Sequence, residues 1–183
     1  MKLNLGCGVN KITGYLNVDK FGEPDLKMDL ELTPWQFEDN SVDEILLNHV
    51  LEHLGADVNI FFKIIQEMYR VSKHGSKIYI NVPHPRHDHF IGDPTHVRII
   101  TPELLGLFSK KNCAHWRKIG AANSPLAEYI NVDFDVVSTT VTLETKYLEA
   151  LRSKKISESD LADLLKTQNN IASEYRITLK VVK

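Results

Sequence analysis

The sequence predicts a doubly wound α/β fold, in which helices alternate with the strands of a mostly parallel sheet. Short apolar segments that read as strands recur along the first half of the chain, at 2–5, 16–19, 25–30, 42–47 and 77–82. The run Ile45-Leu46-Leu47 is typical of a strand that is covered on both faces. A long amphipathic pattern at 57–71 predicts a helix between the last two of these strands.

The first strand and the turn after it predict a ligand site. Leu3-Asn4-Leu5 runs directly into Gly6-Cys7-Gly8, where glycine allows backbone to lie against a ligand. A second strand ends in Asp19, whose carboxylate can accept hydrogen bonds from the two hydroxyls of a ribose. This order of strand, glycine turn, strand and acid favours a nucleotide-type ligand.

The link between these two strands is unusually short. Six residues, 9–14, connect Gly8 to Tyr15, whereas parallel neighbours normally need a dozen or more with a helix. We therefore expect the crossover helix to be absent or reduced to one turn. Without its N-terminus a diphosphate loses its usual support, so a ligand without phosphate is favoured.

The other elements follow from local signals. Asp57 is expected to cap the first helix, and Arg70, Lys73 and Gly75 to close it, before the fifth strand stops at Pro83. The second half is expected to contain four further elements. These are a helix at 101–110 with a Thr101 cap, a strand at 130–143, a helix at 161–170 opened by a capping box at 157–160, and a half-exposed antiparallel strand at 176–182 on one side of the sheet.

Composition points to an ordinary globular protein of one domain. The chain has 183 residues, is 43% hydrophobic and 25% charged, and carries a net charge of −2. Neither nucleic acid nor a membrane is expected as a partner. Cys7 and Cys113 are expected to be free thiols, and the first strand starts too early for a signal peptide, so a cytoplasmic location is predicted.

Several motifs in order resemble those of class I S-adenosylmethionine-dependent methyltransferases, and most of all the small type 11-like group with a shortened link between the first two strands. The matching segments lie at 3–8, 17–19, 40–45, 49–54 and 69–75, and the final strand at 177–183 is also similar. Two features depart from the family pattern: the missing crossover helix, and His74 where proline is usual.

The resemblance implies a three-layer, Rossmann-like sheet of seven strands with the last strand inserted antiparallel, and S-adenosyl-L-methionine as cofactor. By position, Gly6 and Gly8, with Cys7 between them, would line the methionine portion. Asp19 would hold the ribose and Asp29 with Leu30 the adenine edge. Asn48 and His49 would form the floor beneath the sulfonium. The parts of the domain would be a cofactor-binding half at 1–83, a substrate lid or wall at 84–130, and C-terminal strands and helices at 131–183.

Histidines concentrate after the fifth strand, at His84, His87, His89 and His96. Three interpretations are open for these histidines. They could form a polar loop with structural hydrogen bonds, one of them could contact the acceptor or serve as its base, or they could bind a metal. For catalysis we rank His84 first, then His89 and His96, because the fifth strand delivers them to the ligand edge. Arg86 and Arg98 either pair with nearby acids or bind an anionic substrate.

No metal site is expected. His49 and His53 lie four apart with Glu52 between them, but the zinc protease pattern sets glutamate directly after the first histidine. Glu52 and His53 are instead expected to organise the start of a helix and pack under the cofactor.

The sequence thus favours methyl transfer to a small or glycan-type acceptor, by a protein that could form oligomers. One alternative is a non-catalytic module that binds S-adenosylmethionine or a partner. A metal-dependent hydrolase using the histidine loop is another. A nicotinamide enzyme is disfavoured because the third glycine and the anion-binding helix are missing.

Overall fold

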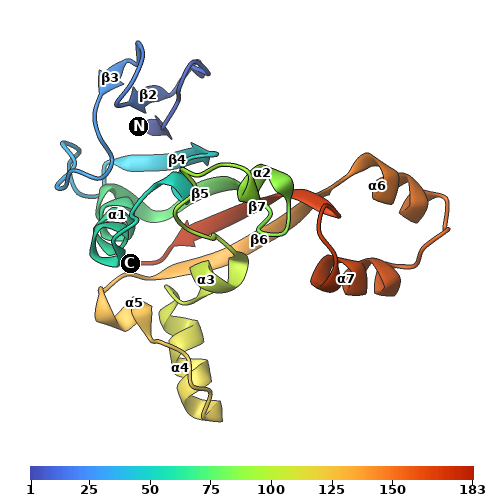
Figure 1. Ribbon diagram of the computed structural model, residues 1–183. Helices are drawn as coiled ribbons and strands as arrows, with labels where there is room; N and C mark the ends of the chain where they lie inside the picture. The colour runs from blue at the N-terminus through green and yellow to red at the C-terminus, as the bar shows by residue number, and fades with distance from the viewer.

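The computed structural model describes residues 1–183 and contains one sheet of seven strands (Figure 1). Their order is β3-β2-β1-β4-β5-β7-β6, with β1 to β5 parallel and β7 antiparallel to both of its neighbours. The strands are β1 Lys2–Leu5, β2 Leu16–Asp19, β3 Leu26–Lys27, β4 Val42–Asn48, β5 Ser72–Pro83, β6 Phe134–Leu143 and β7 Ala172–Val181. The predicted Rossmann-like sheet, mostly parallel with an antiparallel C-terminal strand, is confirmed.

The helices follow β4 and alternate with the later strands. They are the 3-10 helix η1 Leu51–His53 and the α-helices α1 Val58–Val71, α2 Asp88–Ile91, α3 Pro102–Gly106, α4 Lys110–Ile119, α5 Leu126–Tyr129, α6 Thr145–Arg152 and α7 Glu158–Thr167. In Figure 1, α6 and α7 project from the sheet beyond β6 and β7. None of the helices has the length and apolar content that a membrane span requires.

Helices cover one face of the sheet much more than the other. On the covered face, α1 packs beside the segment after α3, where the rings of Phe61 and Phe108 lie 6.2 Å apart. The fully buried Ile45 of β4 belongs to the same apolar core. The opposite face carries Leu46, which is half-buried, and the exposed Asn48. No helix separates β1, β2, β3 and β4 in sequence. The expectation that both faces of β4 are covered is therefore wrong, and the second helical layer is largely missing.

Two buried amides replace the missing crossover helix. The Asn4 Nδ2 atom donates to the Asn10 carbonyl at 3.0 Å and to Asn17 Oδ1 at 2.9 Å. Asn17 Oδ1 also accepts from the Ile12 amide at 2.8 Å, and its Nδ2 donates to Asp25 Oδ2 at 2.7 Å. These bonds satisfy backbone groups that a helix would have satisfied internally. The parallel β1–β2 link without a helix is confirmed.

Some predicted boundaries are wrong. Asp57 does cap α1, accepting from the Asn59 amide at 2.7 Å, but the helix ends at Val71 and β5 begins at the next residue. Gly75 therefore lies inside β5, with φ of +81°. The third strand has only two residues, and the helix expected at 101–110 divides into α3 and α4 because Ser109 caps a new helix start.

The alternating pattern alone predicts the wrong place for the C-terminal strand, whereas the resemblance correctly predicts that it is inserted in the sheet. β7 lies between β5 and β6 rather than on one side of the sheet. Its alternation arises because the exposed Arg176 and Lys180 lie on the open face, whereas Ile177 and Leu179 lie on the buried one. The capping box at Ser157 is confirmed and opens α7. The helix α6 was not predicted.

Candidate functional site

A pocket of about 190 Å³ lies at the carboxyl ends of β1, β2 and β4, where open α/β sheets bind ligands. Residues from the strand ends and from the segments after them line it: Gly6, Asp19, Lys20, Phe21, Met28, Asp29, Leu30, His49, Val50, His53 and Leu54. Five of the residues that the sequence assigned to a cofactor therefore meet in one place. They are Gly6, Asp19, Asp29, Leu30 and His49.

The two glycines of the turn have different physical roles. Gly6 has φ of +67°, and a Cβ added there would lie 2.5 Å from a methyl group of Val50. Gly6 thus lets the segment after β4 pack against the end of β1. Gly8 has φ of +52°, and nothing lies within 4 Å of an added Cβ, so its left-handed backbone rather than close packing favours glycine there.

The Asp19 carboxylate is fixed by the backbone around it. Its Oδ2 accepts from the Gly8 amide and its Oδ1 from the Phe21 amide, each at 2.8 Å. A carboxylate oxygen can accept more than one hydrogen bond. Asp19 is only half-buried, so both oxygens keep lone pairs for ligand hydroxyls.

The part of the pocket beyond Asp19 is mostly apolar. Met28, Leu30 and Leu54 contribute to its wall, and the Phe21 side chain, 70% exposed, stands at the rim. The one cation here is Lys20, whose Nζ lies 3.5 Å from Asp29 Oδ2. Phe21 is not among the residues predicted from the sequence, although its position two residues after Asp19 was a usable signal.

A second hollow of about 550 Å³ lies beside the same glycine turn. Its lining includes Cys7, Gly8 and Asn48 from the expected cofactor residues, together with Ile12 and Leu46. Burial raises the pKa of the Cys7 thiol. The short link leaves this hollow open, because no crossover helix occupies the space over Leu46.

His49 lines both hollows and lies beside two carboxylates. Its Nε2 lies 3.0 Å from Glu174 Oε2, and its Nδ1 lies 3.5 Å from Glu52 Oε1. Glu52, and then Glu174, raise the pKa of His49 against the opposing effect of burial. The backbone of His49 has φ of +55°, a conformation that is uncommon outside glycine. Glu174 lies on β7, and no local sequence signal connects it to His49.

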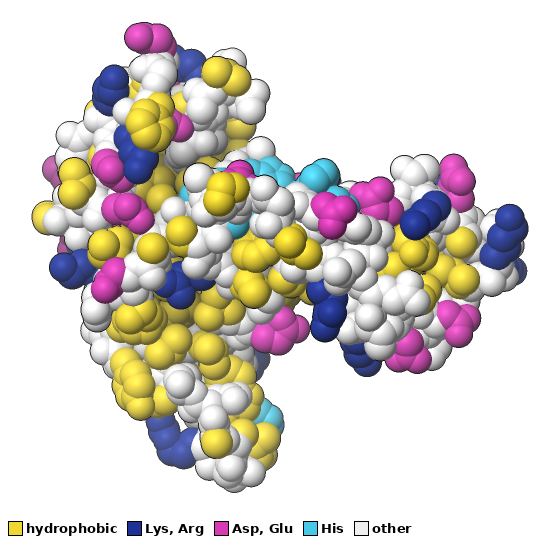
Figure 2. Space-filling model, in the orientation of Figure 1, with side chains coloured by type: hydrophobic (Ala, Val, Ile, Leu, Met, Phe, Trp, Pro, Cys, Tyr) yellow, Lys and Arg dark blue, Asp and Glu magenta, His cyan; other side chains and the backbone are white.

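Most histidines of the loop have hydrogen-bond partners within the protein. Figure 2 shows histidine side chains gathered between the N-terminal strands and the α6–α7 projection. His84 is buried, its Nδ1 accepts from the Arg86 amide at 3.2 Å, and burial lowers its pKa. His87 is also buried, with its Nε2 3.2 Å from Glu144 and its Nδ1 accepting from the His89 amide.

The other predicted site residues of this segment lie in different surroundings. Arg86 and His89 are exposed. The Arg98 guanidinium lies 4.2 Å from the centre of the Phe61 ring and donates to the Gly55 carbonyl. His96 turns toward His53, with ring centroids 4.6 Å apart. The structure therefore does not bring the three proposed catalytic histidines together.

Comparisons with known proteins agree with this fold. A family model described as "Methyltransferase domain" matches residues 19–80. A SAM-dependent methyltransferase from Archaeoglobus fulgidus is 23% identical over 98% of this chain and 85% of that chain, with a TM-score of 0.61. One from Methanosarcina mazei is 15% identical over 100% and 92% of the two chains, with a TM-score of 0.53.

A third similar structure contains ligands. It is the Burkholderia thailandensis 1,6-didemethyltoxoflavin-N1-methyltransferase with bound 1,6-didemethyltoxoflavin and S-adenosylhomocysteine. It is 11% identical over 100% of this chain and 71% of that chain, with a TM-score of 0.55. No curated protein matches the chain. The resemblance to class I, type 11-like methyltransferases is confirmed by the matched domain and by the shared fold.

Proposed function

We propose that this protein is an S-adenosylmethionine-dependent methyltransferase that acts on a small-molecule acceptor. The observation that carries the proposal is the pocket at the ends of β1, β2 and β4, where a fixed carboxylate stands beside a glycine turn. The domain match at 19–80 includes Asp19 and β4 but neither β1 nor the glycine turn.

The residues present fit S-adenosylmethionine better than a phosphate-bearing nucleotide. Asp19 offers lone pairs to two ribose hydroxyls, and Met28, Leu30 and Leu54 offer an apolar surface to an adenine ring. The link at 9–14 contains no helix whose N-terminus could bind a diphosphate. The cation Lys20 is already close to Asp29.

When bound, this cofactor supplies a methyl group that is already activated on a sulfonium. The protein then has to orient the acceptor and exclude water, and positioning alone can lower a barrier by ~7–11 kcal/mol. We propose that Asn48 and His49 form the floor at the reacting end. Both line the hollow next to the glycine turn, and Glu174 fixes the His49 ring.

We propose acceptor contacts for the exposed side of the segment after β5. Of the three histidines considered for catalysis, His89 is the one whose side chain is exposed, and Arg86 is exposed beside it. His84 and His96 have partners within the protein that limit direct contact. A small acceptor with anionic or hydroxyl groups, including a glycan-type one, suits this set of side chains.

Titration calorimetry with S-adenosylhomocysteine, NAD and ATP tests the cofactor. We expect S-adenosylhomocysteine to bind most tightly, because the pocket lacks a phosphate-binding element. Methyl transfer to a panel of small hydroxylated and anionic acceptors then tests the activity. Firm NAD binding together with no response to S-adenosylhomocysteine would end the proposal.

A further inference from the structure

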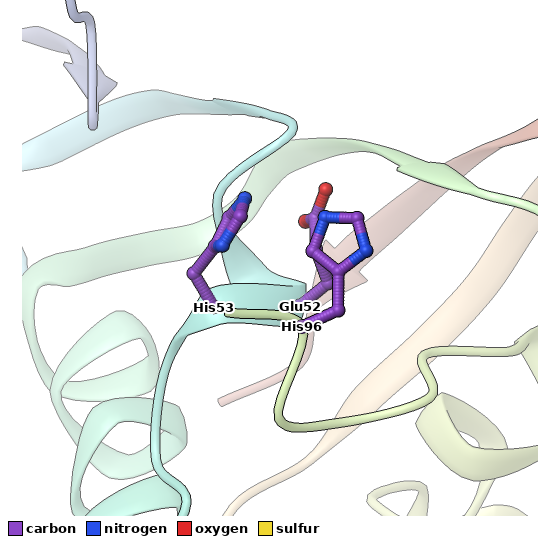
Figure 3. A group of neighbouring side chains, drawn as sticks. All are labelled: Glu52, His53 and His96. Carbon is purple, nitrogen blue, oxygen red and sulfur yellow. The ribbon is translucent and has the colours of Figure 1, made fainter. Parts of the chain in front are cut away.

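We propose that Glu52, His53 and His96 bind one divalent transition-metal ion at the edge of the cofactor pocket. One ligand atom from each of the three side chains lies within 4.8 Å of the others. Figure 3 shows them converging, with Glu52 and His53 on η1 and His96 on the segment that crosses it. Nothing in the sequence joins these positions, because His96 follows His53 by more than forty residues.

The strongest observation is the state of Glu52. Its side chain is 1% exposed, and neither carboxylate oxygen has a hydrogen-bond partner. A buried carboxylate normally accepts several hydrogen bonds or pairs with a cation. The nearest cationic group is the His49 ring, whose Nδ1 lies 3.5 Å from Glu52 Oε1, too far for a good hydrogen bond. A metal ion would satisfy both oxygens.

Surrounding groups fix the two histidines in the tautomer that a metal needs. His96 Nδ1 lies 2.9 Å from the Phe90 carbonyl, which can only accept, so Nδ1 carries the proton. Thr95 Oγ1 donates its own proton to Asp93 at 2.6 Å, so it accepts from His53 Nδ1 at 2.9 Å. Nε2 of each ring therefore keeps a lone pair. Metal-binding histidines are usually held by such a hydrogen bond from the other ring nitrogen.

The backbone holds the site together from both sides. The Glu52 carbonyl accepts from the amides of Val97 and Arg98, at 2.9 and 3.2 Å. These two bonds fix the chain next to His96 against η1. Asp93 Oδ2 lies 3.8 Å from His96 Nε2, so a further oxygen ligand stands close by.

The donor set defines the kind of metal. Two imidazoles and one carboxylate suit Zn²⁺, Fe²⁺, Co²⁺ or Ni²⁺, whereas Mg²⁺ prefers oxygen ligands alone. Three protein ligands leave a coordination position for water or a substrate oxygen. Because His53 also lines the cofactor pocket, that position would border the site. If the proposed methyltransferase function holds, the metal would bind an oxygen of the acceptor.

A different explanation for Glu52 is that it serves only as a buried partner of His49. The two explanations differ at His96, which has no contact with His49 among the hydrogen bonds and ion pairs of the structure. A partner of His49 alone would make His96 irrelevant to metal binding. The proposed site requires His96.

Co²⁺ provides a direct probe, because its visible absorption reports the ligands. We would treat the purified full chain with a chelator, remove the chelator, and titrate the protein with Co²⁺ in the absence of other ligands. We expect one equivalent to bind with bands typical of nitrogen and oxygen ligation, to be displaced by Zn²⁺ and not by Mg²⁺. The melting temperature should rise with Co²⁺.

Glu52→Gln, His53→Ala and His96→Ala should each weaken Co²⁺ binding at least tenfold. His115→Ala is the matched control, because this exposed histidine lies on α4 away from the site. This variant should bind Co²⁺ with the affinity of the unchanged protein. Far-UV circular dichroism and melting without metal identify variants that fail to fold. If all three fail, a crystal of the unchanged protein soaked in Zn²⁺ decides by the position of its anomalous signal.

The proposal is overturned if the folded, unchanged protein binds no Co²⁺, or if His96→Ala binds it as well as the control does. An anomalous signal away from Glu52 and His96 would also overturn it. Failure of S-adenosylhomocysteine to bind would refute the proposed function while leaving this site standing, since the metal titration contains no cofactor.

Discussion

Replacing Asp19 by alanine tests the cofactor assignment most directly. In the structure the carboxylate is held by the Gly8 and Phe21 amides and retains lone pairs for two ribose hydroxyls. A hydrogen bond to a charged group contributes about 1.5–3 kcal/mol. Asp19 is half-buried, so water can replace part of the lost hydrogen bonding. We therefore expect the binding free energy to fall by at least the contribution of one such bond, which corresponds to about a tenfold loss of affinity.

Affinity for S-adenosylhomocysteine, measured by calorimetry, is the assay. The 2′-deoxyribose analogue sharpens it, because the unchanged protein should prefer the ribose form and Asp19→Ala should lose most of that preference. The variant also leaves two amides without their acceptor. Both face solvent near the pocket rim, so we expect its melting temperature to fall by only about 2–4 °C, as for a loss of ~1 kcal/mol.

Asp43→Ala is the matched control. It removes the same charge, and Asp43 accepts from Lys73 and from the chain terminus at the opposite end of β4. We expect it to leave the affinity unchanged. If Asp19→Ala binds both analogues as the unchanged protein does, Asp19 only shapes the turn and the ribose assignment is refuted.

Two further predictions follow from the same region. Gly6→Ala should destabilise the protein by about 1–3 kcal/mol in urea unfolding, because its Cβ would lie 2.5 Å from Val50 at a φ of +67°; Val50→Ala in the same chain should recover part of the loss, and no recovery would contradict the steric reason. Hydrogen bonds from Lys11, and then from Asn17, lower the pKa of Asp25 to about 2. Because the pKa of Asp25 is lower in the folded state, its ionised carboxylate stabilises the fold at pH values above the unfolded pKa of ~3.9, and this stabilisation is lost on acidification. The difference in unfolding free energy between the unchanged protein and Asp25→Ala should therefore shrink as the pH falls from about 4 to about 2. A difference that stays constant over this range would contradict the prediction.

Much of the pocket at the ends of β1, β2 and β4 was predictable because its signals are local. The glycine turn and the acid at the end of β2 follow their strands immediately, so the strand reading alone places Gly6 and Asp19 at one edge of the sheet. The same holds for Asp57, whose capping role depends on residues two and three positions away. Long-range pairs carry no such signal. His49 meets Glu174 across 125 positions, and Glu52 meets His96 only after the segment beyond α2 has folded back.

The misplaced strand shows where a periodic pattern is ambiguous. Alternating exposure in β7, considered alone, predicts a strand at one side of the sheet. Alternation reports that one face of a strand meets water, and it says nothing about how many neighbours the strand has. β7 has two neighbours and one open face. The apolar run of β4 predicts that both faces of the strand are covered. One face is nevertheless open, because Leu46 borders the hollow left by the short link.

The short link and the segment after β5 together limit how an acceptor could be enclosed. A substrate lid or wall is expected at 84–130, and the start of this segment is held by several hydrogen bonds. Asp88 and Asn170 exchange two hydrogen bonds of 2.9 Å, His87 contacts Glu144, and the Glu52 carbonyl accepts from the chain next to His96. Opening the segment would break these contacts together. The hollow above Leu46 needs no such change, since no helix covers it. Under the proposed function, the shortened link would therefore leave the reacting end accessible to an acceptor.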